Sequence, residues 1–198
     1  MTVAVAVRWN GVTALCADTA TFQGHRIVEH RSKIHEVPVG WYSFAGSVAC
    51  RQAAAPVFEA LERLESAAHH RQLVTNLREA LKAQGWNGTS DKGAPSHHGF
   101  SALLVLRSGQ VVEIGCDLSL TVSPVEEQKI ATIGYGAELA SGAAYALIGA
   151  FPKTAPMGDQ RPVAQRMAER AVEIACDRSA WCDAPGKSVV VAQEGSDA

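Results

Sequence analysis

The sequence lacks the features that would place it in several other protein classes. It has no CxxC pair, and its cysteines are odd in number and widely spaced, which fits neither a disulfide framework nor a zinc site. This cysteine usage favours a reducing, cytoplasmic location. No apolar run is long enough to span a membrane, and Arg8 interrupts the apolar start that a signal peptide requires. The five cysteines are Cys16, Cys50, Cys116, Cys176 and Cys182.

The chain also lacks a large excess of positive or negative charge. Charged residues make up 19% of the chain and the net charge is −2, so neither nucleic acid nor an anionic membrane is an expected partner. Gly-rich phosphate loops, a G-x-S-x-G turn and an H-E-x-x-H motif are all missing. The pairs His69-His70 and His97-His98 lie in polar, turn-like stretches, which favours exposed loop histidines over metal ligands. We expect no metal and no cofactor.

What is present indicates a globular protein. With 198 residues and 47% hydrophobic residues, the chain predicts a single domain over 1–198 with a polar tail from about 193 to 198. Val3, Val5 and Val7 alternate with smaller or polar residues, which predicts a first strand that begins at Thr2. The dipeptide Asn10-Gly11 predicts a hairpin turn into the next strand.

The rest of the chain alternates runs of strands with pairs of helices. Ser47 is a plausible helix N-cap, and Pro56 predicts a kink or break inside the helical pattern that follows. This order argues for an α+β fold rather than a parallel βαβ sheet. We expect strands at 12–18, 32–37, 41–46, 100–106, 111–115, 119–124, 128–136 and 187–192, helices at 47–70, 71–85, 137–150 and 161–180, and loops at 19–31 and 86–99.

Four segments of this pattern, "TVAVAVRWNG", "LCADTAT", "SKIHEV" and "FAGSVA", resemble the β-type subunits of proteasomes and the bacterial HslV-like peptidases, which are N-terminal nucleophile hydrolases. Their order and spacing fit, apart from one residue missing before Lys33. The resemblance continues more weakly through "KIATIGYG" and the final helix–strand unit, and so covers nearly the whole chain. It implies a four-layer αββα sandwich, in which two antiparallel sheets are flanked by helix pairs.

The resemblance also implies a set of catalytic residues. Thr2 matches the family's nucleophile, exposed once Met1 is removed, and Asp18 and Lys33 match the buried acid and lysine. Gly46 matches the glycine whose backbone N–H serves as oxyanion hole. The chemistry is sensible by itself, because a freed α-amine with a pKa of about 7.7–8 suits a general base at neutral pH. Each residue taken alone also has a plainer interpretation, as a turn acid, a strand-end lysine or a packing glycine.

Two further groups of residues follow from the same match. Phe44, Ala49 and Ala53 would line the pocket for the substrate residue before the scissile bond, and Phe44 suggests a restricted depth. Three other positions depart from the family pattern around the active site. These positions are Tyr135, which stands where a serine is usual, Ser179, which stands where true proteasomes have an acid, and Cys182, which stands where they have a serine.

The sequence therefore predicts a threonine-type endopeptidase subunit that cleaves unfolded proteins or peptides. The resemblance implies a homo-oligomer of stacked hexameric or heptameric rings, and leaves open whether an ATPase unfoldase feeds the chamber. The departures at Tyr135, Ser179 and Cys182 motivate a first alternative, a ring protein with weak or no activity. A stand-alone N-terminal nucleophile amidase and an unrelated binding module are the others.

Overall fold

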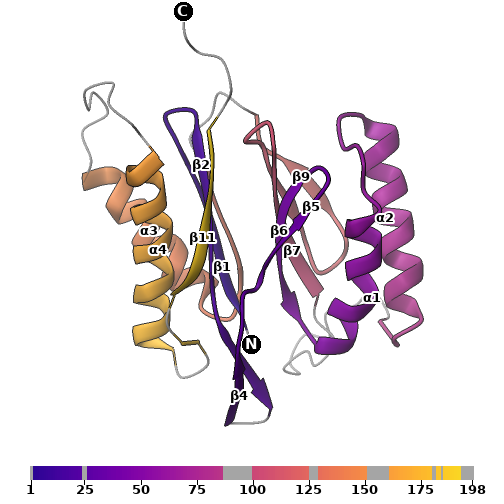
Figure 1. Ribbon diagram of the computed structural model, residues 1–198, viewed down its shortest axis with the longest axis horizontal. Coiled ribbons are helices and arrows are strands. Elements are labelled where there is room, and N and C mark those ends of the chain that lie inside the picture. Colours follow the sequence, from indigo (N-terminus) through magenta and orange to yellow (C-terminus); the bar gives the residue numbers. More distant parts are fainter. Residues whose placement is uncertain are drawn as a thin grey trace, which may run out of the picture.

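The protein is built on two antiparallel sheets with helices on their outer sides. The computed structural model describes residues 2–23, 26–86, 100–124, 129–150, 161–179, 182–183 and 185–192. One sheet has the order β10-β1-β2-β11 and the other the order β5-β6-β7-β8-β9, and the two lie side by side in the middle of the molecule (Figure 1). The strands are β1 (Val3–Trp9), β2 (Val12–Asp18), β3 (Ala20–Gln23), β4 (Arg26–His30), β5 (Ile34–Val37), β6 (Gly40–Gly46), β7 (Phe100–Leu106), β8 (Val111–Ile114), β9 (Leu120–Val122), β10 (Lys129–Gly134) and β11 (Pro185–Ala192). The helices are α1 (Val48–Glu59), α2 (Ala67–Lys82), α3 (Ala137–Ala150) and α4 (Arg161–Arg178).

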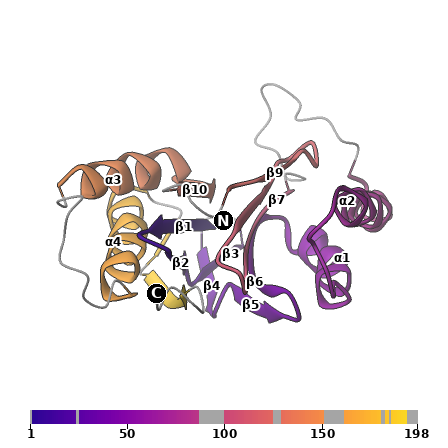
Figure 2. The ribbon, with the colours of Figure 1, turned by 90° about the horizontal axis from the view of Figure 1, so that it is seen from above.

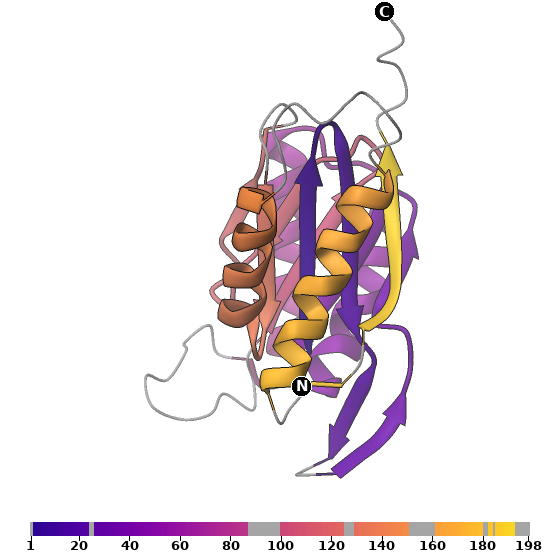
Figure 3. The same ribbon diagram turned by 90° about the vertical axis from the view of Figure 1, so that its left-hand side faces the viewer.

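The alternation in β1 assigns its residues to two different cores. Val3, Val5 and Val7 belong to the cluster that packs against α3 and α4, the helices in front of this sheet in Figure 3. Ala4 and Ala6 point the other way, into the cluster shared with the second sheet. Both faces of β1 are therefore buried, because helices cover one and a sheet covers the other. Small residues on the inner face let the two sheets approach closely.

The second sheet carries α1 and α2 on its other face, as the view from above shows (Figure 2). Tyr42 and Phe44 of β6 pack in the cluster with Phe58 of α1 and Leu77 of α2. The rings of Tyr42 and Phe58 stack with their centroids 4.4 Å apart. Ala45 of the same strand faces the first sheet instead. The predicted α+β class is thus confirmed. Within the described residues, strand pairing is antiparallel in both of these sheets and in a third, two-stranded sheet formed by β3 and β4.

The predicted hairpin turn is confirmed at Asn10-Gly11. Asn10 has a φ of 47° and Gly11 a φ of 77°, the left-handed pair that a two-residue turn of type I′ requires. The turn joins Trp9 to Val12 as facing residues of β1 and β2. This register fixes which end of β2 lies beside the start of β1.

The prediction of a loop at 19–31 is wrong, because most of this segment forms the antiparallel two-stranded ribbon β3–β4. The ribbon projects beyond the rest of the molecule (Figure 3), and every residue of β4 is exposed. With no buried face, β4 has no need of the apolar alternation by which strands are found, whereas β3 begins at the fully buried Ala20. The strand prediction at 32–37 starts two residues early, since β5 begins at Ile34.

The helix prediction at 47–70 is also wrong. The helix α1 runs through Pro56 and ends at Glu59, and α2 starts at Ala67, where the Ser66 hydroxyl accepts a hydrogen bond from the backbone N–H of His69. Both His69 and His70 are therefore helical rather than loop residues.

Some predicted features lie outside the described residues. They are the loop residues from 87 to 99, with His97 and His98, and the tail from 193 to 198. Among the helices that are described, none has the length and apolar character needed to cross a membrane.

Candidate active site

A buried ion pair lies where β2 ends and β5 is about to begin. Asp18 is the last residue of β2 and is fully buried, and Lys33, just before β5, is 6% exposed. The Lys33 ammonium donates to both carboxylate oxygens of Asp18, with Nζ–O distances of 2.9 Å. Buried charges are rare in proteins unless they are paired. The sequence prediction that these two residues form a buried acid–lysine pair therefore agrees with the geometry.

Burial and pairing act against each other on this pair. Burial raises the pKa of Asp18, while the Lys33 charge and the hydrogen bonds from Lys33 and the Val3 amide oppose the rise. Burial lowers the pKa of Lys33, and the Asp18 charge opposes that fall. Asp18 therefore binds a proton more readily than an exposed aspartate would, and Lys33 releases its proton more readily than an exposed lysine would. Perturbed pairs of this kind cluster at functional sites.

Thr2 lies beside this pair through the backbone of β1. The peptide N–H that follows Thr2, that of Val3, donates to Asp18 Oδ1 at 2.9 Å. The same oxygen accepts from Lys33 Nζ, so one carboxylate oxygen joins the start of β1 to the lysine. Thr2 itself is 7% exposed. The structure thus brings Thr2, Asp18 and Lys33 together, as the sequence predicts.

The end of β10 fixes Thr2 from the other side. The backbone N–H of Tyr135 donates to the Thr2 carbonyl oxygen at 2.8 Å. Gly134 has a φ of +92°, and a Cβ atom there would lie 1.9 Å from that same oxygen and 3.1 Å from the Ala45 side chain. Only glycine fits this close approach. The "KIATIGYG" segment therefore holds the first residue of β1 by its backbone rather than by a side chain.

The three positions that depart from the family pattern lie together behind this contact. Cys182 Sγ donates to the Tyr135 carbonyl oxygen at 3.1 Å and lies 3.7 Å from Ser179 Oγ. A Cβ atom on Gly136 would lie at an ordinary van der Waals distance, 3.6 Å, from Cys182 Sγ. Tyr135 is 52% exposed, and it contacts Thr2 through its backbone N–H and Cys182 through its carbonyl oxygen.

Gly46 ends β6 directly before Ser47, the N-cap of α1, whose hydroxyl accepts from the Cys50 N–H at 3.1 Å. Gly46 has a φ of 150°, which favours glycine. Its neighbour Ala45 faces Gly134, so the end of β6 and the start of β1 meet at the same end of the two sheets. A backbone N–H at a helix N-terminus is a natural donor to an anion.

The residues predicted to line a specificity pocket differ in their burial. Phe44 is buried in the core between β6 and α1, with the Arg51 guanidinium 5.9 Å from the centre of its ring. Ala53 is partly buried against the same core, and Ala49 is exposed. Their role in binding stays a prediction.

Sequence reasoning missed three contributors to this site: the Val3 amide, Gly134 and Cys176. Ser179 lies next to both Cys176 and Cys182, because its N–H donates to the Cys176 carbonyl oxygen at 3.3 Å and its Oγ lies 3.7 Å from Cys182 Sγ. The Val3 amide carries no side-chain signal, and the role of Gly134 depends on a contact between distant strands. The cysteines are in the sequence, but their separation across the end of α4 matches no redox or metal motif.

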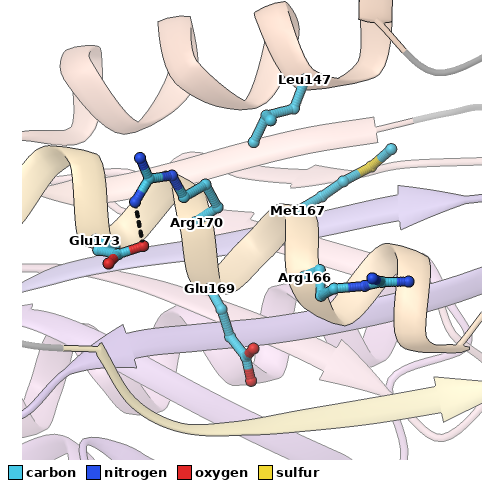
Figure 4. Close-up of a pocket in the computed structure, with 6 residues that line it drawn as sticks. All are labelled: Leu147, Arg166, Met167, Glu169, Arg170 and Glu173. Carbon is cyan, nitrogen blue, oxygen red and sulfur yellow. Dashed lines mark hydrogen bonds and ion pairs between the residues drawn. The ribbon is translucent and has the colours of Figure 1, made fainter.

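A separate surface hollow of about 340 Å³ lies between α3 and α4 (Figure 4). None of the residues that line it belongs to the candidate site, and the Arg170–Glu173 ion pair spans one side. Within the described ranges, no group of three or more His, Cys, Asp and Glu side chains could hold a metal ion. The hollow is lined by Leu147, Arg166, Met167, Glu169, Arg170 and Glu173.

Comparison with solved structures identifies the fold. The chain superposes on BPH of Thiobacillus denitrificans with a TM-score of 0.73 and 24% identity, covering 98% of this chain and 99% of that one. The same protein in complex with epoxomicin gives a TM-score of 0.72 and 22% identity, with 98% and 100% covered. Eukaryotic HslV from Trypanosoma brucei gives 0.64 and 21%, with 97% and 99% covered. No family model and no curated protein matched the sequence.

These similarities define a class of fold. The chain shares its fold with the BPH of Thiobacillus denitrificans and the HslV of Trypanosoma brucei over nearly its whole length. This agrees with the resemblance seen in the sequence segments around Thr2, Asp18, Lys33 and Gly46.

Proposed function

We propose that this protein is a threonine-type endopeptidase subunit whose nucleophile is Thr2, exposed by removal of Met1. One observation carries the proposal: Asp18 Oδ1 accepts hydrogen bonds from both the Val3 amide and the Lys33 ammonium, at 2.9 Å each. A buried lysine is thereby held beside the first residue after Met1. The similarity of fold to a protein solved with epoxomicin bound supports the same conclusion.

The proposed chemistry begins with the free α-amine of Thr2. A threonine hydroxyl is a weak nucleophile until a base takes its proton, and the amine of the same residue is within reach directly or through one water. The positive charge of Lys33 disfavours a second charge close by, which lowers the pKa of the amine and favours loss of the hydroxyl proton. Asp18 holds Lys33 in position and favours its charged form.

The Thr2 oxygen then attacks the carbonyl carbon of the scissile peptide bond. The developing oxyanion accepts a hydrogen bond from the Gly46 N–H at the start of α1, and one such donor contributes about 3–4 kcal/mol to stabilising the transition state. The amine returns its proton to the leaving nitrogen, and an ester at Thr2 remains. Water attacks the ester and frees the enzyme.

In this proposal the chain is a single domain over residues 1–198 with the four-layer αββα arrangement, and it works in the cytoplasm as a homo-oligomer. The β3–β4 ribbon supports the assembly. Ile27 and Val28 are 44% and 54% exposed, and a two-stranded ribbon is marginally stable unless it packs against something. A neighbouring copy in a stacked hexameric or heptameric ring is the partner that we expect. Light scattering of the purified protein tests this, since a monomer would favour the stand-alone amidase.

A weakly active or inactive ring protein is the second candidate, and the Tyr135–Cys182 contact favours it. A thiol is a weaker donor than a hydroxyl, and here it donates to the carbonyl oxygen of Tyr135, the residue whose N–H positions Thr2. This candidate predicts a normal particle with a free Thr2 that reacts slowly or not at all.

Hydrolysis of a labelled, unfolded protein tests the proposed function. We expect the purified particle to release peptides, Thr2→Ala to abolish release while the particle still assembles, and Thr2→Ser to retain part of the activity. Release by Thr2→Ala at the wild-type rate would refute the mechanism. An inactive wild type with a free Thr2 would select the second candidate.

A further inference from the structure

Two thiols lie together directly behind the backbone that holds Thr2. Cys176 is in the last turns of α4 and Cys182 follows the end of that helix. Ser179 lies next to both, because its N–H donates to the Cys176 carbonyl oxygen at 3.3 Å and its Oγ lies 3.7 Å from Cys182 Sγ, and the two thiols interact electrostatically with each other. Cys182 is 8% exposed and Cys176 is partly exposed, so a small oxidant can approach from the Cys176 side. The proposed function uses neither thiol as a nucleophile.

Cys182 is connected to Thr2 by two consecutive hydrogen bonds through Tyr135. The Cys182 thiol donates to the Tyr135 carbonyl oxygen at 3.1 Å, and the Tyr135 N–H donates to the Thr2 carbonyl oxygen at 2.8 Å. A sulfur in a disulfide carries no hydrogen and cannot donate. Oxidation of Cys182 therefore removes the donor to Tyr135 and loosens the residue that holds Thr2.

The surroundings of the two thiols favour one of them as the first to react. The hydrogen bond from Cys176 lowers the pKa of Cys182, burial opposes this, and the Ser179 hydroxyl and the Lys33 charge add to the lowering. The partner thiol, Cys176, has its pKa raised by the same hydrogen bond and by burial. A cysteine with enhanced thiolate character beside a second, resolving cysteine is the usual arrangement of a redox-sensitive site.

We propose that Cys176 and Cys182 form a reversible disulfide in response to peroxide, and that this disulfide weakens the hydrogen-bonded positioning of Thr2 through Tyr135. Its consequence for peptide hydrolysis rests on the proposed function. The formation of the bond and the loosening of the backbone do not.

The reaction balances with hydrogen peroxide as the oxidant. The Cys182 thiolate attacks one peroxide oxygen, the O–O bond breaks and hydroxide leaves, which gives a sulfenic acid. The Cys176 thiol then attacks that sulfur, an S–S bond forms and water leaves from the S–O bond. In total, two thiols lose two electrons and two protons, and one peroxide is reduced to two waters. A reducing thiol restores both cysteines.

The first test asks which cysteines are joined. The whole protein is treated with hydrogen peroxide, its remaining thiols are alkylated under denaturing conditions, and its mass and non-reducing peptide map are measured. We expect three alkylated cysteines of the five and a peptide pair that links Cys176 to Cys182, both reversed by dithiothreitol. The exposed Cys116 supplies the matched control, because Cys116→Ser should leave the disulfide intact while Cys176→Ser abolishes it. Five free thiols, or a bond between other cysteines, would overturn the proposal.

The second test follows the backbone without relying on activity. Amide hydrogen exchange at Tyr135 is compared in the reduced and oxidised protein, and we expect several-fold faster exchange after oxidation. Peroxide-treated Cys182→Ser should show no change, because its hydroxyl keeps a donor for Tyr135 and cannot be oxidised to a disulfide. An unchanged rate in the disulfide-bonded protein would refute the link to Thr2. If Thr2 proves unable to hydrolyse peptides, the proposed function fails, but both tests keep their meaning.

Discussion

Asp18 and Lys33 form a bidentate ion pair in the interior of the protein, with both Nζ–O distances at 2.9 Å. The same carboxylate accepts a hydrogen bond from the Val3 backbone N–H. The acid that orients the lysine thus also fixes the first peptide bond after Thr2. A displacement of Asp18 would move both at once. The geometry explains why a strand begins directly after Thr2: the first residue of that strand, Val3, is hydrogen-bonded to a buried carboxylate.

Breaking this pair should be costly, whereas replacing it should not. We expect Asp18→Ala to lower the free energy of unfolding by about 3–5 kcal/mol, because the buried Lys33 ammonium and the Val3 amide both lose their hydrogen-bond acceptor. The double variant Asp18→Leu/Lys33→Met should recover most of that loss and remain inactive. Denaturant unfolding and peptide hydrolysis measure the two effects. The exposed pair Arg107–Glu36 is the control, since Glu36→Gln should change stability by less than about 1 kcal/mol. Activity in the double variant would contradict the role of the pair.

The pH dependence of stability at Asp18 has a definite sign. Burial raises the pKa of this carboxyl above the ordinary value of 3.8, so just above that pH the folded protein binds the proton more firmly than the unfolded chain does. The resulting stabilisation is fully present below pH 3.8 and is lost as the pH rises through the raised pKa. We therefore expect the difference in unfolding free energy between wild type and Asp18→Asn to fall as the pH rises from 3.8 through the raised pKa of Asp18. Urea unfolding at several pH values measures it, and a difference that grows with pH would show that pairing outweighs burial.

Gly134 should tolerate no side chain. An added Cβ would lie 1.9 Å from the Thr2 carbonyl oxygen, and the φ of +92° strains any other residue. We expect Gly134→Ala to lower the free energy of unfolding by at least about 1–3 kcal/mol and to reduce the reactivity of Thr2. Gly142 in α3 has open space around an added Cβ, so Gly142→Ala should stabilise by about 0.5–1 kcal/mol. Thermal or denaturant unfolding compares the two, and equal stabilities would refute the contact at Thr2.

The thiol donor at Cys182 should be replaceable by a hydroxyl but not by a methyl group. Cys182→Ser keeps a donor for the Tyr135 carbonyl oxygen, and we expect near wild-type stability and peptide hydrolysis. Cys182→Ala leaves that carbonyl without its donor and should cost about 1 kcal/mol of unfolding free energy, with a larger loss in the rate of hydrolysis. Similar rates for the two variants would show that the hydrogen bond does not position Thr2.

The sequence predicts those parts of the fold whose pattern is local. The alternation from Val3 to Val7 and the Asn10-Gly11 turn both indicate the structure that is found, because a strand's period and a type I′ turn depend on neighbouring residues alone. The β3–β4 ribbon escaped prediction because β3 has only four residues and the residues of β4 are all exposed, with no apolar alternation to mark the strand. The start of α2 escaped because the cap at Ser66 follows a helical pattern that continues across a break.

The site divides in the same way. Thr2, Asp18, Lys33 and Gly46 are found through the order of short segments at strand ends, which a resemblance can match. Apart from the Asp18–Lys33 ion pair, the contacts at this site are made by backbone groups, such as the Val3 and Tyr135 amides, and by strands far apart in sequence. No side-chain pattern records such contacts, so only the folded structure reveals them.

The intact mass of the purified protein, before and after incubation with an epoxyketone probe, tests the central claim most directly. The account predicts that Met1 is absent and that one probe molecule adds to each chain, with no adduct on Thr2→Ala. Retention of Met1, or a free Thr2 that never takes up the probe, would contradict the assignment of Thr2 as the nucleophile.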